Sequence, residues 1–120
     1  MKPAISDTDF GSITVSGERY ERDIIIRLNG KIEKRKKKLS KAEFGTSHIV
    51  SIEEAEFLFE PEAEALIIGT GQSGQVVLSS EAAVFFQHKR CSVRLLPTPE
   101  AIRAWNDATG KVIGMFHVTC

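Results

Sequence analysis

The sequence contains few cysteines and no long apolar segment. Its two cysteines, Cys91 and Cys120, predict neither a disulfide framework nor a CxxC metal site, and we expect both thiols to be reduced. No stretch approaches the roughly 18 apolar residues that a membrane-spanning helix needs, and Met1-Lys2-Pro3 does not begin an apolar signal sequence. These absences predict a soluble, cytoplasmic protein without a membrane span.

The chain also lacks net charge, but its charges are unevenly distributed. Seven of its 16 basic residues fall in the segment 31–41, KIEKRKKKLSK, where Glu33 is the only acid. Such a block can bind nucleic acid or another anion, or it can lie on a solvated edge strand that lysines protect from aggregation. Nucleic acid is the less expected partner, because no aromatic residue lies among the charges to stack on bases. The candidate anion-binding surface consists of Lys34, Arg35, Lys36, Lys37 and Lys38.

At 120 residues the chain is expected to form one domain, residues 1–120. Its first third alternates like a set of strands. The β-branched run Ile24-Ile25-Ile26 is followed by Asn29-Gly30, a strong hairpin signal. Residues 10–37 therefore predict an antiparallel meander whose charged last strand lies at an edge or faces water.

The rest of the chain alternates between helical and extended patterns. Ser51 and Glu54 form a capping-box pattern that predicts a helix ending before Pro61. Further on we expect strands at 65–68, 92–96 and 112–118. We also expect one helix capped by Ser79 or Ser80, and another that is capped by Thr98, has Pro99 as its first residue and ends at Gly110. Strands alternating with helices predict an α/β fold in layers.

Residues 69–74 read GTGQSG, and they follow an apolar run, as in a dinucleotide-binding fingerprint. That fingerprint needs a helix whose N-terminus directly follows the glycines. Here Gln75-Val76-Val77-Leu78 predicts extended chain instead, and Cys91–Leu96 contains no carboxylate to hold a ribose. We therefore predict no nucleotide cofactor. Gly69-Thr70-Gly71 is expected to be a turn at a strand end, either purely structural or lining a pocket for a small molecule or anion.

A candidate pocket follows from placing this turn beside the histidine-containing segments. His48 follows two hydroxyl residues, but no GxSxG nucleophile elbow is present, and a structural role for the imidazole is the simpler interpretation. The candidate pocket residues are Thr46, Ser47, His48, Gly69, Thr70, Gly71 and His117.

The segment His117-Val118-Thr119-Cys120 offers two further alternatives. His117 and Cys120 together with His48 could hold a metal, or a thiolate–imidazole pair could act as a nucleophile. No ligand pair has a recognised spacing, so the sequence predicts no metal and no cofactor, and it favours a last strand docked in the core.

The combined pattern resembles the Mth938-like domain family. The resemblance covers nearly the whole chain and rests on Phe10-Gly11, Tyr20, Asp23-Ile24, the basic run to Ser40, Gly45-Thr46-Ser47-His48, Ile67-Ile68-Gly69-Thr70-Gly71, Pro97-Thr98-Pro99, Trp105-Asn106 and His117-Val118-Thr119-Cys120. Trp105 stands where such relatives more often have tyrosine. The resemblance implies a three-layer α/β fold with a mixed central sheet beside the N-terminal meander, and it brings no established catalytic residues. Relatives include an animal protein associated with fat-cell differentiation and a mitochondrial assembly factor for respiratory complex I.

The sequence contains no complete catalytic constellation. It favours a non-catalytic module that binds a protein partner or assists assembly, and it leaves enzymatic activity undecided. The alternative is a protein that binds a small molecule or anion, with or without catalysis, near Gly69–Gly71 and His48. A third hypothesis is nucleic-acid binding through Lys31–Lys41.

Overall fold

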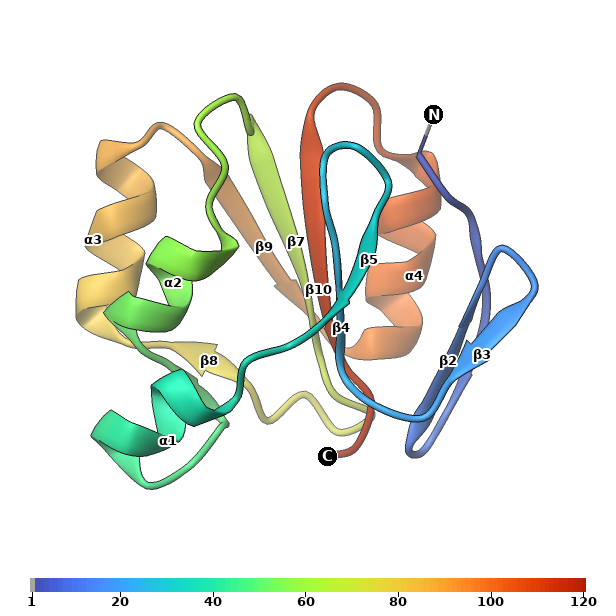
Figure 1. Ribbon diagram of the computed structural model, residues 1–120, viewed down its shortest axis with the longest axis horizontal. Helices are drawn as coiled ribbons and strands as arrows, with labels where there is room; N and C mark the ends of the chain where they lie inside the picture. The colour runs from blue at the N-terminus through green and yellow to red at the C-terminus, as the bar shows by residue number, and fades with distance from the viewer. Residues whose placement is uncertain (1) are drawn as a thin grey trace.

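The computed structural model describes residues 2–120 (Figure 1). The strands are β1 (Ile5–Asp9), β2 (Ser12–Val15), β3 (Glu18–Tyr20), β4 (Ile24–Ile26), β5 (Ile32–Lys34), β6 (Ile49–Val50), β7 (Ala65–Thr70), β8 (Val77–Leu78), β9 (Ser92–Leu96) and β10 (Val112–His117). The helices are α1 (Lys38–Phe44), α2 (Ile52–Leu58), α3 (Ser80–His88) and α4 (Thr98–Asp107). None of these helices is long and apolar enough to cross a membrane.

A mixed five-stranded sheet with the order β5-β4-β10-β7-β9 forms the centre of the fold. Strands β7, β9 and β10 are parallel, whereas β4 and β5 form an antiparallel hairpin beside β10. The hairpin turns at Gly30, which has a φ of +86°. The basic segment, residues 31–41, runs through β5, which is an edge strand as the lysine pattern predicts.

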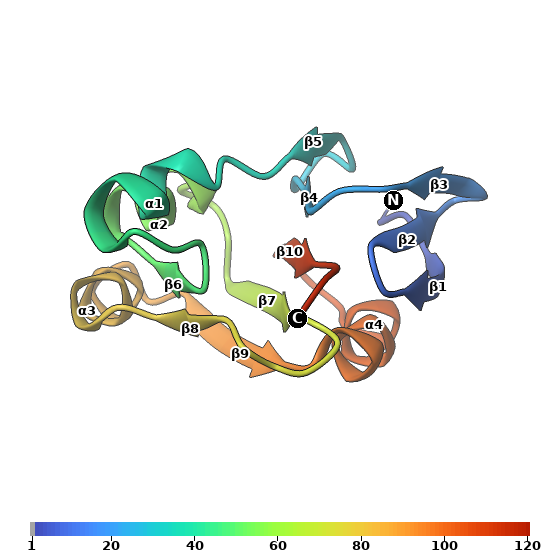
Figure 2. The same ribbon diagram turned by 90° about the horizontal axis from the view of Figure 1, so that it is seen from below.

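Two apolar clusters, one on each face of this sheet, give the three-layer α/β fold that the resemblance implies. On one face Ile25, Leu66 and Ile113 pack against α2 and α3. On the other face Ile24 and Phe116 pack against α4, β1 and β2. Figure 2 shows α1, α2 and α3 on one side of the sheet, and α4 with the β1–β3 sheet on the other.

The N-terminal meander is divided between two sheets, which corrects the prediction of a single meander over residues 10–37. Strands β1, β2 and β3 form their own antiparallel sheet, and the chain then crosses into the central sheet at β4. The reason lies in Ile24-Ile25-Ile26, which are all fully buried. A strand that is apolar on both faces needs cover on both faces, and only the central sheet provides it.

The helix starts at Ser51 and Ser79 are confirmed, because the two side-chain hydroxyls accept hydrogen bonds from the N–H groups of Glu54 and Ala82. The start of α4 differs from the prediction. Thr98 is the first helical residue and not the cap, because its hydroxyl donates to the carbonyl of His117. That helix also ends earlier than predicted, at Asp107 rather than at Gly110.

Candidate functional site

The carboxyl ends of the three parallel strands meet at one edge of the central sheet, at the lower end of Figure 1. Strand β7 ends at Thr70, β9 at Leu96 and β10 at His117. Ligands of open α/β sheets bind most often outside such strand ends. The chain continues from β10 through Cys120, which brings the C-terminal segment across the same edge (Figure 2).

The glycine-rich loop, residues 69–75, is hydrogen-bonded to the C-terminal segment, residues 118–120. The N–H of Gln72 donates to the carbonyl of Thr119 at 2.7 Å, and the N–H groups of Ser73 and Gln75 donate to the carbonyl of Cys120. Backbone amides that would cradle a phosphate in a nucleotide site are therefore bound to the chain itself. The loop continues into β8 rather than into a helix, as the sequence predicts.

Gly69, Thr70 and Gly71 are buried and lie where the glycine-rich loop contacts the C-terminal segment. A Cβ at Gly71, where φ is +109°, would overlap the carbonyl group of Cys120 and lie 2.8 Å from Cδ2 of His117. The N–H of Gly71 donates to the Thr98 hydroxyl at 2.9 Å. The three residues therefore position His117 and Cys120, and they do not form an open pocket surface.

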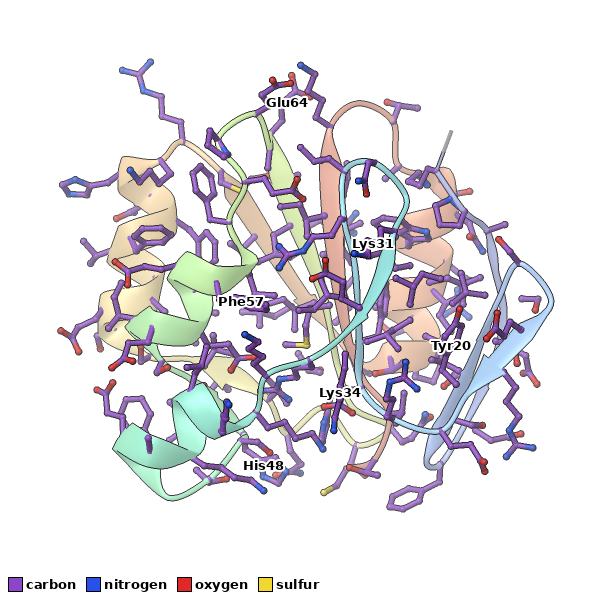
Figure 3. All side chains as sticks on the ribbon, viewed as in Figure 1. Tyr20, Lys31, Lys34, His48, Phe57 and Glu64 are labelled. Carbon is purple, nitrogen blue, oxygen red and sulfur yellow. The ribbon has the colours of Figure 1, made fainter. Side chains whose placement is uncertain are left out.

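Three side chains from distant segments converge at this edge, and we call His48, His117 and Cys120 the His–Cys cluster. Nε2 of His48 lies 3.5 Å from Sγ of Cys120, and the two imidazole rings meet edge to face with centroids 5.4 Å apart. One nitrogen of each histidine and the sulfur all lie within 4.8 Å of one another. Figure 3 marks His48 at the lower end of the molecule, near the end of the chain.

Asp23 contacts the Nδ1 side of the His117 ring. Its Oδ2 lies 2.7 Å from Nδ1 of His117, and its Oδ1 accepts a hydrogen bond from the N–H of Val118 at 3.0 Å. Burial raises the pKa of Asp23, but the hydrogen bond and charge of His117, the Val118 amide and the charge of Arg35 outweigh burial and lower that pKa to about 2. Asp23 is therefore a buried carboxylate at neutral pH.

Arg35 links Asp23 to α2 and to the loop before β6. Its guanidinium donates to Asp23 at 3.0 Å, to both carboxylate oxygens of Glu54 at 2.7 and 3.2 Å, and to the carbonyl of Ser47 at 2.7 Å. Glu54 also accepts a hydrogen bond from the hydroxyl of Ser40. Among residues 2–120 no buried side-chain nitrogen or oxygen is left without a partner. A fully paired network of this kind is rigid, and through Asp23 it fixes the position of His117 in the His–Cys cluster.

A cavity of about 530 Å³ opens beside Asp23, and we call it the basic cavity. All five residues of the candidate anion-binding surface line it, together with Arg22 and Asp23. Arg35 is only 2% exposed, so its charge lies inside the fold and is neutralised there. Lys37 lies 3.6 Å from Oδ2 of Asp23, and Lys36 stacks over Phe57, with its Nζ 4.5 Å from the ring centroid. Figure 3 labels Lys34, one of the residues that line the basic cavity.

The remaining candidate pocket residues have mainly structural contacts. The hydroxyl of Thr46 accepts a hydrogen bond from the N–H of His48, and Ser47 contributes its carbonyl to Arg35. Sequence reasoning missed Asp23 and Glu54 as parts of the site. The available signal was a carboxylate where an apolar residue is expected: Asp23 directly precedes the Ile24–Ile26 run, and Glu54 falls on the apolar face of α2.

The arrangement offers two kinds of chemistry. The basic cavity presents positive charge beside a buried carboxylate. The His–Cys cluster presents a thiol next to an imidazole, with a second imidazole oriented by Asp23, which is a set of groups suited to a nucleophile or to a metal ion.

Comparisons with known proteins match this chain to one family model and to several solved structures with the same fold. Residues 5–117 match the profile of a family described as "Protein of unknown function (DUF498/DUF598)". The conserved hypothetical protein PH1505 from Pyrococcus horikoshii is 31% identical, with 97% of this chain and 98% of that chain covered and a TM-score of 0.88. A structure named MT938 is 35% identical over 99% of this chain and all of that chain, with a TM-score of 0.81. A Bordetella pertussis protein described as a Mth938-like domain is 17% identical, covers 97% and 85% of the two chains and shares the fold with a TM-score of 0.68.

Proposed function

The chain belongs to the DUF498/DUF598 family and is similar to the Mth938-like proteins, and on this premise we propose that it binds a small anionic ligand in the basic cavity. The family is one of unknown function, so the proposal rests on the geometry of this chain. The observation that carries it is the convergence of six basic side chains on one cavity whose single carboxylate, Asp23, is already paired.

The charges at the cavity mouth are available to a ligand. Arg22, Lys34 and Lys38 are exposed, and within residues 2–120 none of them forms an ion pair. They come from three places in the chain: the residue before Asp23, the end of β5 and the start of α1. A volume of about 530 Å³ suits a metabolite-sized ligand, because such sites commonly measure about 300–1,000 Å³.

The folded arrangement favours a compact anion over a nucleic acid. Arg35 points inward to two carboxylates, Lys36 lies on Phe57, and Lys37 is half-buried beside Asp23. Only part of the basic segment can then contact phosphates in a row. A compact anion needs charges that converge, whereas a polymer needs charges that follow its backbone.

Titration with inorganic pyrophosphate at low salt, followed by calorimetry and by amide chemical shifts, tests the proposal. We expect the double variant Lys34→Ala/Lys38→Ala to weaken binding by at least about tenfold, since each lost contact to a charged group is worth about 1.5–3 kcal/mol. The matched control Lys31→Ala/Lys41→Ala removes the same charge from the same segment but from residues that do not line the cavity. An equal loss in both variants contradicts the proposal. Tighter binding of DNA or RNA than of pyrophosphate, with a steep salt dependence, also contradicts it.

A protein-interaction or assembly-assisting role is a second candidate, favoured by an apolar surface on another side. Two adjacent hollows of about 600 and 430 Å³ share Ser80 and Glu81. Val77 and Val84 line them and are each 51% exposed. Exposed apolar surface of this kind can mark a protein contact.

The second candidate makes a prediction of its own. A partner recovered with the wild-type protein should be lost with Val77→Glu/Val84→Glu and retained with Lys34→Ala/Lys38→Ala. Equal recovery with all three proteins contradicts the assignment of this surface.

A further inference from the structure

We propose that the His–Cys cluster is a binding site for a divalent transition-metal ion, with Zn²⁺ as the ion that its donor atoms fit. The ligands are one imidazole nitrogen each from His48 and His117, and the thiolate of Cys120. This proposal does not depend on anion binding in the basic cavity.

The distances are close to those of a tetrahedral site. With bonds of about 2.0–2.1 Å to nitrogen and about 2.3 Å to sulfur, zinc ligands lie about 3.3–3.6 Å from one another. The His48 Nε2 to Cys120 Sγ distance is 3.5 Å, and all three ligand atoms lie within 4.8 Å of one another. Two ligands are therefore already at the required separation, and the third has to move closer to them.

His117 contacts a carboxylate through one ring nitrogen, as metal-bound histidines usually do. A ligating imidazole almost always gives its second ring nitrogen to a carboxylate or carbonyl, which fixes its tautomer and orientation. Here Nδ1 of His117 lies 2.7 Å from Oδ2 of Asp23, so Nδ1 faces the carboxylate and Nε2 is directed away from it. Asp23 is itself held by Arg35 and by the Val118 amide.

The Nε2 atom of His117 has one competing partner. The hydroxyl of Thr119 lies 3.1 Å from it, and this side chain is only partly buried. Metal binding replaces this single hydrogen bond between two side chains. The three ligands leave a fourth position for water or another small ligand, as in zinc sites with three protein ligands.

The donor set selects the kind of ion. Two imidazoles and a thiolate are nitrogen and sulfur ligands that suit zinc and its spectroscopic substitute cobalt, whereas Mg²⁺ and Ca²⁺ prefer oxygen ligands. The ligands come from residues 48, 117 and 120, so spacing along the sequence does not reveal them.

The experiment uses the reduced, tag-free protein after treatment with a chelator. Addition of Co²⁺ should produce a thiolate-to-cobalt absorption band that saturates at one equivalent, and Zn²⁺ should displace the cobalt. Competition with a chromophoric chelator then gives the zinc affinity. Zn²⁺ should also raise the melting temperature, because it binds the folded state.

Variants at half-buried ligands separate metal binding from folding. We expect His48→Gln and Cys120→Ser to weaken zinc binding by at least about 100-fold, since loss of an outer partner alone costs about 10–100-fold. His88→Gln and Cys91→Ala replace the same residue types outside the cluster and should bind zinc as the wild type does. Lys34→Ala/Lys38→Ala should also bind zinc normally, which separates this result from the test of the basic cavity.

Absence of a saturable thiolate-to-cobalt band in the wild-type protein overturns the proposal, whatever the variants do. A band that persists in Cys120→Ser but disappears in Cys91→Ala also overturns it. Circular dichroism of each variant shows whether a lost band reflects a lost ligand or an unfolded chain.

Discussion

Nδ1 of His117 lies 2.7 Å from Oδ2 of Asp23, and each side chain is only 2% exposed. This contact joins the end of β10 to the residue that precedes β4, so it fastens two neighbouring strands of the central sheet. It also lies between the two candidate sites. Asp23 lines the basic cavity, and His117 belongs to the His–Cys cluster.

Acid should destabilise the metal-free protein through Asp23. The pKa of this carboxyl is about 2 in the folded state against 3.8 when unperturbed. Its contribution to the free energy of unfolding is therefore nearly complete above about pH 4. That contribution is lost as the pH falls from about 4 to 2, and a shift of nearly two units corresponds to about 2.5 kcal/mol. Urea unfolding at pH 7, 4, 3 and 2 measures this loss.

The variant Asp23→Asn is the control for this acid effect. It removes the titrating group, so its stability should change less than that of the wild type between pH 4 and 2. Parallel losses in the two proteins would show that other carboxyls cause the acid sensitivity.

Replacing Arg35 should be among the most destabilising single changes at a charged residue. Arg35→Met leaves Asp23 and Glu54 as buried carboxylates without their shared cation, and breaking such a group typically costs about 3–5 kcal/mol. The neighbouring Lys34→Met alters an exposed side chain and should change stability by no more than about 0.5 kcal/mol. Chemical denaturation of both variants measures the difference, and equal stabilities would contradict the role given to Arg35.

The parts of the fold that could be predicted from the sequence are those set by local signals. Serines at helix starts, the Asn29-Gly30 turn and the apolar run before Gly69 each act within a few residues, and each lies where expected. The division of the N-terminal strands between two sheets depends on long-range burial of Ile24-Ile25-Ile26. No local pattern states which sheet covers a strand on both faces.

The candidate site was less predictable because its contacts join distant segments. Thr98 looks like a helix cap, but its hydroxyl is used by His117, 19 residues away. Arg35 reads as one of five surface charges, yet it is the buried one, because two carboxylates at positions 23 and 54 face it. Pairing of this kind exists only after the chain has folded.

Gly71→Ala should destabilise the protein strongly and loosen the C-terminal segment. The new Cβ would overlap the carbonyl group of Cys120, and the φ of +109° is unfavourable for any side chain. We expect a loss of at least about 3 kcal/mol, which combines backbone strain with displaced packing. The matched control is Gly74→Ala, which has a φ of +70° but no neighbour closer than 3.6 Å, and it should cost only about 1–2 kcal/mol. Equal costs would mean that the close approach to Cys120 is not maintained in solution.

The two cysteines should react with iodoacetamide at very different rates. Cys91 is 4% exposed in an apolar cluster, and burial raises the pKa of its thiol, so the reactive thiolate is scarce. Cys120 is only half-buried, and its sulfur lies 3.5 Å from Nε2 of His48.

At pH near 8 we expect alkylation at Cys120 at least about 100-fold faster than at Cys91, whose reaction requires opening of the fold. Peptide mass spectrometry of timed samples measures both rates in one protein. His48→Gln should slow the reaction of Cys120 and leave that of Cys91 unchanged, because the imidazole contacts only the former thiol. Zn²⁺ should protect Cys120 in the wild type but not in His48→Gln, since the metal needs both ligands. Similar rates at the two cysteines would contradict the placement of Cys91 in the core.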